Sequence, residues 1–268
     1  MMNIYEHKLW GTNERKINLT SGSYLSLKYL FPNLTNKKSK LLDIGCAAGA
    51  YTASIKKYFP KVDTTGIDIS TNCIKYAKNN FPNNHFVIGN IEKMPFAKNS
   101  FKYVTANHIL EHTKNPKDVI CEVKRVLTTS GIFYSVTPTE GSILTIIGWL
   151  RKFPFFDNNR INYLGHVQKF TKESLIQLLE NNGFEIIETK WSCHFSYQII
   201  DAFYYPFLYL INKNTHFMGE THFGKSESRL TRKLFWATKA CLNILSNFES
   251  ILLSRVPGFA IHITAVKQ

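Results

Sequence analysis

The sequence predicts an α/β fold in which a largely parallel sheet is covered by helices on both faces. Three observations support this prediction. Between residues 41 and 136, short apolar runs alternate with segments of helical periodicity, which is typical of parallel strands joined by helices. A glycine-rich turn follows the first run, at the position where doubly wound sheets approach a ligand. The closing stretch GFAIHITAV alternates side-chain character, which predicts a last, antiparallel strand.

The first half of the chain carries five predicted strands with helices between them. The apolar run LLDI forms the first strand, and Gly45 to Gly49 turn the chain into a helix. A helix at 118–127 has valines along one side, and Gly131 opens the fifth strand. The predicted strands are 41–44, 62–69, 85–88, 101–106 and 132–136, and the helices are 51–58, 72–79 and 118–127.

The regular alternation stops after Pro138. Residues 141–165 hold SILTIIGWL and then RKFPFFDNNR, which we interpret as an insertion. Regularity returns at Thr171, a good helix N-cap, and Gly183 ends the helix that follows. The remaining predicted elements are a helix at 172–182, a strand at 184–191, a long aromatic-rich stretch, and the closing strand at 258–266.

Length and composition favour one main domain without an export signal. A chain of 268 residues that is 44% hydrophobic can bury a large core. The N-terminal residues are charged where a signal peptide needs an apolar segment, and no apolar run approaches about 18 residues. The five cysteines form no CxxC pair, which argues against a disulfide framework or a zinc site. We therefore expect a cytoplasmic protein, with membrane association as an alternative.

The formal net charge of +14 has two interpretations. It favours an anionic partner, such as nucleic acid, a membrane surface or an acidic substrate. Solubility alone accounts for it equally well, because no isolated basic tail marks a nucleic-acid-binding arm.

Two acids follow neighbouring predicted strands. Asp43 lies at the end of the first strand and Asp68 at the end of the second, in GIDIS. A carboxylate at the position of Asp68 can accept both hydroxyls of a ribose. The turn GCAAG lacks the G-x-G-x-x-G spacing of dinucleotide enzymes, and Asp43 would repel a pyrophosphate. The ammonium group of S-adenosylmethionine (SAM) suits this arrangement better.

Several motifs occur in a fixed order: LLDIGCAAG, GIDIS, GNIEKMPFAKNSFKYV, HILEH followed by NP, EVKRVLTTSG and HVQKFTKESLIQLLENNGFEII. Together they resemble the class I SAM-dependent methyltransferases, specifically the type-11 methyltransferase domain. The resemblance implies a Rossmann-like, doubly wound sheet of seven strands with the last one antiparallel, and SAM as methyl donor. It implies a cofactor site that contains Asp43, Gly45, Cys46, Gly49, Asp68, Ile69, Asn90, Ile91 and Asn107, with Met94 beside the adenine pocket.

The chain departs from the family pattern at two of these positions. Ala47 stands where the family has the middle glycine of the turn, and Asn90 stands where an aspartate usually faces the adenine amino group. An asparagine carbonyl can still accept that hydrogen bond. The departures are therefore compatible with weaker SAM binding and do not imply its loss.

Three histidines are candidates for the chemistry: His108 and His112 in HILEH, and His166 in GHVQKFT. HILEH spells H-x-x-E-H, a zinc pattern on a helix, but no third ligand is indicated and we expect no metal. The family implies that HILEH lines the pocket beside the donor's methyl group. Related quinone-ring O-methyltransferases hold magnesium with a glutamate where His108 stands, which leaves a metal as an alternative. His166 precedes the helix on the family's substrate side, where an imidazole either takes a proton from an acceptor hydroxyl or simply packs.

Apolar segments near the C-terminus set this chain apart from the plain domain. Between residues 230 and 251 apolar side chains recur at spacings of four and three, which predicts one stripe along a helix. With SILTIIGWLRKFPFF and IIDAFYYPFLYLI, this composition suits core packing, a dimer seam or an interfacial lid at a membrane. The stripe consists of Leu230, Leu234, Ala237, Cys241, Ile244, Phe248 and Ile251.

These patterns predict a SAM-dependent methyltransferase that methylates an oxygen of a small hydrophobic or lipid-like acceptor at a membrane surface. Charge and aromatic content suggest an RNA methyltransferase as one alternative, although no D/N-P-P-Y loop follows the fourth strand. A non-catalytic assembly protein that forms a homodimer through the stripe is the other. We divide the chain into an N-terminal helical segment or lid at 1–37 and a methyltransferase domain at 38–268, with apolar insertions at 141–165 and 195–256.

Overall fold

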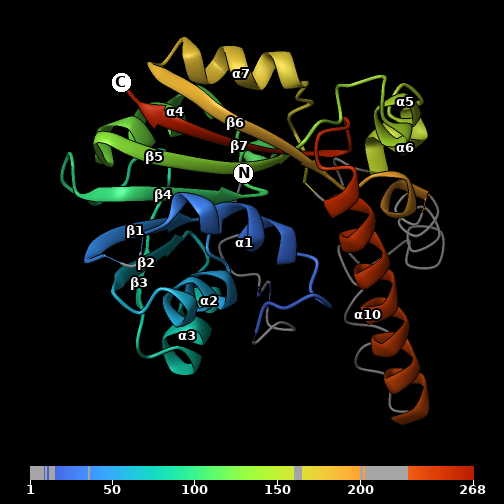
Figure 1. Ribbon diagram of the computed structural model, residues 1–268, viewed down its shortest axis with the longest axis horizontal. Helices are drawn as coiled ribbons and strands as arrows, with labels where there is room; N and C mark the ends of the chain where they lie inside the picture. Colours follow the sequence, from blue (N-terminus) through green and yellow to red (C-terminus); the bar gives the residue numbers. More distant parts are fainter. Residues whose placement is uncertain are drawn as a thin grey trace.

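Seven strands form one sheet in the order β3-β2-β1-β4-β5-β7-β6 (Figure 1). The computed structural model describes residues 16–35, 37–159, 165–199 and 229–268, together with residues 9, 11 and 202. Strands β1 to β5 pair in parallel, and β7 runs antiparallel to both β5 and β6. The predicted doubly wound sheet with an antiparallel last strand is confirmed. The strands are β1 Ser39–Ile44, β2 Val62–Asp68, β3 His85–Ile88, β4 Phe101–Asn107, β5 Leu127–Pro138, β6 Phe184–Ser192 and β7 Ala260–Lys267.

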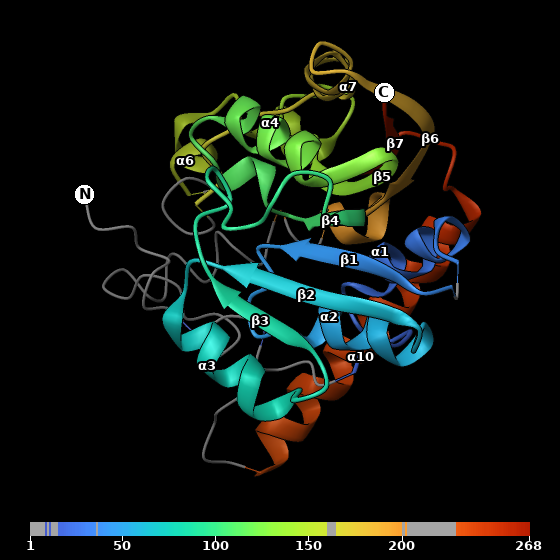
Figure 2. The ribbon, with the colours of Figure 1, turned by 90° about the vertical axis from the view of Figure 1, so that its left-hand side faces the viewer.

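Helices cover both faces of the sheet (Figures 1 and 2). Side chains alternate between the faces of a strand, so Leu42 of β1 packs with α4 and α7, whereas Leu41 packs with α1 and α2 on the other face. The described helices are α1 Tyr24–Leu30, η1 Phe31–Asn33, α2 Ala50–Tyr58, α3 Thr71–Asn80, η2 Leu110–His112, α4 Pro116–Val126, α5 Ile146–Leu150, α6 Pro154–Asn159, α7 Lys172–Glu180 and α10 Arg229–Leu252.

The strand order reverses between β1 and β4, which are neighbours although β2 and β3 lie between them in the sequence. Ile44, at the end of β1, pairs with Ile67 of β2 on one side and Ala106 of β4 on the other. Doubly wound sheets bind their ligands beyond the carboxyl ends of the strands at such a reversal. The fold therefore brings the ends of β1, β2 and β4 to one place.

The helix predicted around 230–251 is confirmed as α10, which extends away from the sheet (Figure 1). Its apolar stripe is largely exposed: 77% of Leu230 and 60% of Phe248 face solvent. The buried face is polar instead, because the Asn247 amide donates to the carbonyls of Leu19 and Ser21 in the loop before α1. The prediction of core packing is therefore wrong for Leu230 and Phe248. The dimer seam and the membrane contact stay predictions.

The apolar insertions are described only in part. Helices α5 and α6 occupy much of 141–165, while residues 160–164, 200–201 and 203–228, including most of IIDAFYYPFLYLI, lie outside the described residues. Within the described part of the chain, no helix is long and apolar enough to cross a bilayer. All five cysteines are free thiols, as their spacing predicts.

Candidate functional site at the carboxyl ends of β1, β2 and β4

The glycine turn after β1 has the backbone that its sequence predicts. Gly45 and Gly49 adopt φ of +68° and +84°, which glycine tolerates best. A Cβ on Gly49 would lie 2.7 Å from the Phe86 ring, and one on Gly45 would overlap the Ile109 side chain. The amides of Gly45 and the buried Cys46 donate to the carbonyl of Ile67. The turn is thereby fastened to the end of β2.

Ala47 adopts a left-handed backbone with φ of 47°, at the position where the family has a glycine. This conformation costs an alanine about 1–2 kcal/mol. The Ala47 amide donates to Oδ2 of Asp68 at 2.8 Å. That charged hydrogen bond offsets part of the strain, so the turn keeps its shape without the glycine.

Asp68, the last residue of β2, points its carboxylate at the glycine turn. Oδ2 accepts from Ala47, and Oδ1 accepts from the Ser70 amide at 2.8 Å. Burial raises the pKa of Asp68, and the amide hydrogen bonds oppose that rise. The Ile69 amide also interacts with this carboxylate. The carboxylate has four acceptor positions, so at least one remains beyond these three amides. Ile69, the predicted cofactor residue next to Asp68 in the chain, is partly exposed.

Asp43 lies one residue before the end of β1 and is only 2% exposed. Its oxygens accept hydrogen bonds from Thr52 Oγ1 of α2 at 2.6 Å and Thr105 Oγ1 of β4 at 3.0 Å. Burial raises the pKa of Asp43 to about 7, although both hydroxyls oppose the rise. Asp43 therefore connects β1 to α2 and β4, and its direct contact with a ligand stays a prediction.

Asn107 ends β4 beside these residues. Its side-chain nitrogen and oxygen are both shielded from solvent; the amide interacts with the Tyr51 hydroxyl, but neither atom has a hydrogen bond of good geometry among the described residues. A buried polar group without a partner costs about 1–3 kcal/mol. A ligand with both a donor and an acceptor would remove that cost. Asn107 was predicted from the family resemblance, and its burial gives the prediction a physical reason.

The predicted adenine contacts lie after β3. Asn90 is exposed, and its side-chain oxygen accepts from the Glu92 amide at 2.9 Å. That oxygen, expected to accept from adenine, is therefore already engaged in a local turn. Ile91 packs against the core cluster, and Met94 is buried in it. The adenine contact of Asn90 and Ile91 stays a prediction.

His108 follows Asn107 in a left-handed conformation with φ of 51°. Histidine is among the residues that tolerate this region. The His108 amide donates to the carbonyl of Val136 at 2.9 Å, and Nδ1 lies 3.3 Å from Oε1 of Glu111. Its side chain is 49% exposed, so the imidazole is available to a ligand.

The other two candidate histidines lie on the far side of Glu111. The rings of His112 and His166 meet edge to face at 4.8 Å between centroids. His166 Nδ1 lies 2.9 Å from Oε1 of Glu140, and Arg151 pairs with the same carboxylate. Sequence reasoning missed Glu140, although an acid just after the fifth parallel strand is the signal that would have found it.

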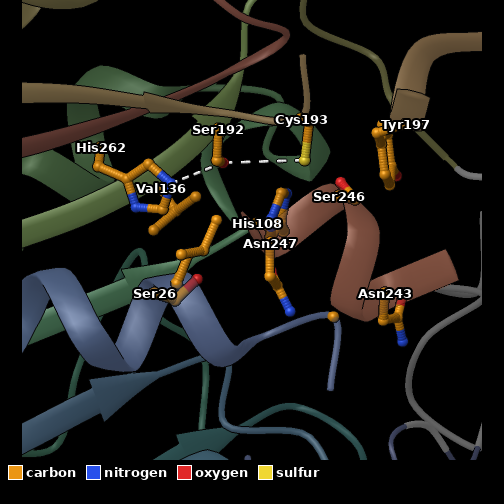
Figure 3. Close-up of a pocket in the computed structure, with 12 residues that line it drawn as sticks. Ser26, His108, Val136, Ser192, Cys193, Tyr197, Asn243, Ser246, Asn247 and His262 are labelled. Atoms are coloured by element: carbon orange, nitrogen blue, oxygen red, sulfur yellow. Dashed lines mark hydrogen bonds between the residues drawn. The ribbon is translucent and has the colours of Figure 1, made fainter. Parts of the chain in front are cut away.

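A pocket of about 40 Å³ lies between α1, α10 and the ends of β5, β6 and β7 (Figure 3). His108 forms part of its wall, which joins the pocket to the end of β4. None of its twelve lining residues is Asp, Glu, Lys or Arg. The polar lining consists of Ser26, His108, Ser192, Cys193, Tyr197, Asn243, Ser246, Asn247 and His262.

A comparison with known protein families identifies the family of this chain. A family model described as a methyltransferase domain matches residues 22–189, more than half of the chain. The chain belongs to this methyltransferase family. Class I members use SAM, so the predicted enzyme class and cofactor are confirmed for the family to which this methyltransferase belongs.

Curated relatives of the methyltransferase include enzymes named for quinone biosynthesis. A demethylmenaquinone methyltransferase of Chlorobaculum tepidum is 32% identical over 170 residues, or 57% of this chain and 68% of that protein. A ubiquinone biosynthesis O-methyltransferase of Coxiella burnetii is 25% identical over 60% of this chain and 70% of its own length. An uncharacterized methyltransferase of Schizosaccharomyces pombe is 30% identical, but the match spans only 48% of this chain and 46% of that protein.

Solved structures share the fold of the methyltransferase at low identity. Phosphoethanolamine N-methyltransferase 2 of Haemonchus contortus, crystallised with SAM, superposes with a TM-score of 0.59 at 16% identity, over 91% of this chain and 52% of that one. Geranyl diphosphate C-methyltransferase of Streptomyces coelicolor gives 0.56 at 12% identity, over 91% and 79%. These similarities concern the fold alone.

The residues of this methyltransferase fit SAM. The buried Asn107 amide supplies the donor and acceptor that an amino-acid group needs, and Asp68 keeps acceptor capacity for a ribose. The glycine turn brings the Ala47 amide to the Asp68 carboxylate. The ends of β2 and β4 thus offer groups for two parts of one cofactor.

His262 is a buried histidine in the pocket wall. It is 3% exposed, with Nδ1 at 2.7 Å from the Tyr134 hydroxyl and Nε2 at 2.7 Å from the Ser192 hydroxyl (Figure 3). Burial lowers the pKa of His262 from 6.5 to about 3. The folded methyltransferase therefore keeps this ring neutral at pH values where the unfolded chain protonates it.

This shift predicts a loss of stability in acid. Below about pH 6.5 the unfolded state binds a proton at His262 that the folded state does not. The contribution of His262 to the free energy of unfolding therefore falls by about 2 kcal/mol between about pH 7 and pH 5. Asp43, whose folded pKa is raised, contributes the opposite slope in this range. Urea unfolding of wild type and His262→Asn at both pH values separates the two. We expect wild type to lose about 2 kcal/mol more than the variant, and parallel losses would contradict the assignment.

Proposed function

We propose that this methyltransferase transfers the methyl group of SAM to an oxygen of a small hydrophobic acceptor whose head is polar but uncharged. The observation that carries the proposal is the pocket beside His108, whose lining combines apolar surface with hydroxyl, amide and imidazole groups and contains no Asp, Glu, Lys or Arg. A charged head, such as a diphosphate, would find no Lys or Arg in that lining. A hydroxyl on a ring would find hydroxyl, amide and imidazole partners.

Different residues of the chain bind the cofactor, bind the acceptor and accept the proton. Asp68 and Asn107 hold the sugar and amino-acid ends of the cofactor, which when bound supplies an electrophilic methyl group. The pocket holds the acceptor head and excludes water from it. His108, between Asn107 and the pocket, accepts the hydroxyl proton as the oxygen attacks. Positioning is the main contribution in such an in-line displacement, and the base adds to it.

The relatives support a quinone-type acceptor, and one of them, named an O-methyltransferase, supports an oxygen as the accepting atom. Two of them are named for demethylmenaquinone and for ubiquinone biosynthesis, and both names refer to quinone chemistry. A quinol offers an uncharged hydroxyl on an apolar body, which is the combination that the pocket favours. The pocket admits only a few atoms, about the space of three water molecules, so the apolar body of such an acceptor would remain outside it.

The exposed stripe of α10 supports contact with a membrane that carries the acceptor. Leu245, Phe248 and Leu252 are each more than half exposed, and apolar side chains on a partly basic helix favour an interfacial position. Lys233 is exposed on the same helix. An anionic membrane is the surface that fits both the apolar side chains and the positive net charge.

Labelled SAM tests the proposal directly. We expect methyl transfer to a demethylated quinol carried in anionic vesicles, and also to a short-chain, water-soluble quinol. RNA should receive no label. Label on RNA at low and high salt, or on neither quinol, would contradict the proposed acceptor class.

The variant Phe248→Ser/Leu252→Ser isolates the membrane contact. Both side chains are exposed on α10, so the fold and the pocket should be unaffected. We expect about a tenfold lower rate with vesicles, because losing two interfacial apolar side chains removes at least about 1.4 kcal/mol of binding. The rate with the soluble quinol should not change. Equal rates of variant and wild type on vesicles would reject the membrane contact while leaving the chemistry in place.

A further inference from the structure

The serine that ends β6 places a hydroxyl group in the wall of the pocket. Ser192 is only 4% exposed and lines the pocket beside His262 and Cys193 (Figure 3). We propose that Ser192 donates a hydrogen bond to a second oxygen of the acceptor and so selects acceptors whose head carries two oxygens. The inference rests on the proposed function, because it takes this pocket as the acceptor site, and it adds the residue that recognises the rest of the head.

Tyr134 determines which nitrogen of His262 carries the proton. Tyr134 is buried, and its hydroxyl lies 2.7 Å from Nδ1 of His262, which is its hydrogen-bond partner among the described residues. A buried hydroxyl that only accepts leaves its own proton without a partner, which is costly. The Tyr134 hydroxyl therefore donates to Nδ1.

His262 transmits this direction to Ser192. Burial lowers the pKa of His262 from 6.5 to about 3, so the ring is neutral and only one of its nitrogens carries a proton. Because Nδ1 accepts from Tyr134, that proton is on Nε2, which lies 2.7 Å from the Ser192 hydroxyl oxygen. Ser192 therefore accepts a hydrogen bond from His262 and does not donate to it.

The proton of the Ser192 hydroxyl has only a weak acceptor within the protein. Among the described residues, that acceptor is the Cys193 sulfur at 3.8 Å (Figure 3), and a thiol accepts hydrogen bonds weakly. Burial raises the pKa of Cys193 to about 12, so the sulfur stays in the neutral thiol form. A ligand oxygen is a better acceptor than a thiol, and it would replace the sulfur without breaking the bond between Ser192 and His262.

Ser192 and His108 reach the pocket from different strands. His108 follows β4 and Ser192 ends β6, and β5 and β7 lie between these two strands in the sheet. The His108 amide donates to the carbonyl of Val136 of β5, and Val136 pairs with His262 of β7. Both side chains nevertheless line one pocket. In the proposed function the acceptor hydroxyl contacts His108, so the Ser192 hydroxyl is left for a different oxygen.

The pocket limits the kind of head that makes both contacts. Its volume of about 40 Å³ admits only a few atoms, so the two oxygens have to be close together in the acceptor. The oxygen that faces Ser192 has to accept a hydrogen bond, which a carbonyl, ether or hydroxyl oxygen does and a methylene group does not. A phenol with a second oxygen on its ring meets both conditions.

Nitrogen NMR of His262 tests the direction of the hydrogen bonds without any ligand. We expect the Nε2–H tautomer in the wild-type protein, and the spectrum of His262→Asn assigns the signals. The Nδ1–H tautomer would overturn the proposal, because Ser192 would then donate to the ring and not to a ligand. This measurement depends neither on SAM nor on methyl transfer.

Two phenols of similar size test the contact itself. In 2-methoxyphenol an ether oxygen stands where 2-ethylphenol has a methylene group. Titrations followed by NMR, without SAM, give the dissociation constant of each phenol for wild type and for Ser192→Ala. The substitution should change the ratio of the two constants by about 3-fold to 10-fold in favour of 2-ethylphenol, which is the effect of one neutral hydrogen bond.

Thr189→Val is the matched control, because Thr189 lies on the same strand but does not line the pocket, and the ratio should stay at the wild-type value. An unchanged ratio in a folded Ser192→Ala variant would overturn the proposal, as would a wild-type protein that binds neither phenol. Thermal unfolding identifies a variant that fails to fold, and the tautomer of His262 decides the question in that event.

Methyl transfer from labelled SAM is measured separately, which distinguishes the two proposals. Transfer to a quinol with no change of ratio in Ser192→Ala overturns only the role of Ser192. A change of ratio without any transfer overturns only the proposed function, since the hydrogen bond to the second oxygen is then present in a protein that does not methylate the acceptor.

Discussion

Replacing Asp68 with alanine should weaken SAM binding about 100-fold, or about 2.7 kcal/mol. The substitution removes the remaining acceptor capacity for the ribose hydroxyls, and hydrogen bonds to a charged group contribute about 1.5–3 kcal/mol each. It also removes the carboxylate that holds the Ala47 amide. Without that bond, the strained turn at Ala47 loses one of the contacts that fix it. Calorimetric titration with SAM measures the effect.

Asp63→Ala is the control for this measurement. Asp63 is an exposed acid on the same strand, and its side-chain partner is Lys56 at 3.4 Å. Exposed ion pairs contribute little to stability, so SAM affinity should stay at the wild-type value. A folded Asp68→Ala variant with affinity within about threefold of wild type, a difference of only about 0.7 kcal/mol, would remove Asp68 from the cofactor site.

Local patterns were sufficient to predict most of the sheet. Each central strand is a short apolar run bounded by a turn signal, and the helix that Thr171 N-caps begins at Lys172, as predicted. The fifth strand is longer than predicted, because β5 already begins at Leu127, before Gly131. Gly131 therefore lies within the strand and does not open it. A glycine marks a change in backbone freedom, which is an imprecise signal for a strand boundary.

The site was predictable where it follows the ends of strands. Asp43, Asp68 and Asn107 lie where the family resemblance places them, since position along a strand fixes the edge of the sheet that a residue reaches. Their contacts were not predictable. The two threonine hydroxyls that engage Asp43 belong to α2 and β4, and only the folded chain brings those elements together.

Helical periodicity predicted α10 but not which face is buried. The apolar side chains recur at helical spacing, yet serine and asparagine side chains form the buried face. The reason is local: the loop before α1 presents backbone carbonyls, and the amides of Asn243 and Asn247 bind them. Backbone carbonyls that a helix covers need hydrogen-bond partners. A pattern that counts only apolar residues cannot predict this requirement.

Replacing His108 with asparagine should lower the rate of methyl transfer about 100-fold while leaving SAM affinity unchanged. A positioned base contributes about 10²-fold to 10⁴-fold, and an asparagine amide cannot take the acceptor proton. Asparagine is chosen because it also tolerates the left-handed backbone of His108. The turn after β4 should therefore survive, and the loss should appear in kcat. Single-turnover transfer from labelled SAM to the soluble quinol gives the rate of the chemical step.

The pH profile distinguishes a base from a residue that only shapes the pocket. If His108 takes the proton, His108→Asn loses the wild-type dependence of the rate on pH together with the activity. His85→Ala, on the exposed face of β3, should keep the wild-type rate and profile. A His108→Asn variant that is slow but keeps the same pH dependence would make His108 a positioning residue, and the proton would then leave through another group in the pocket or through water.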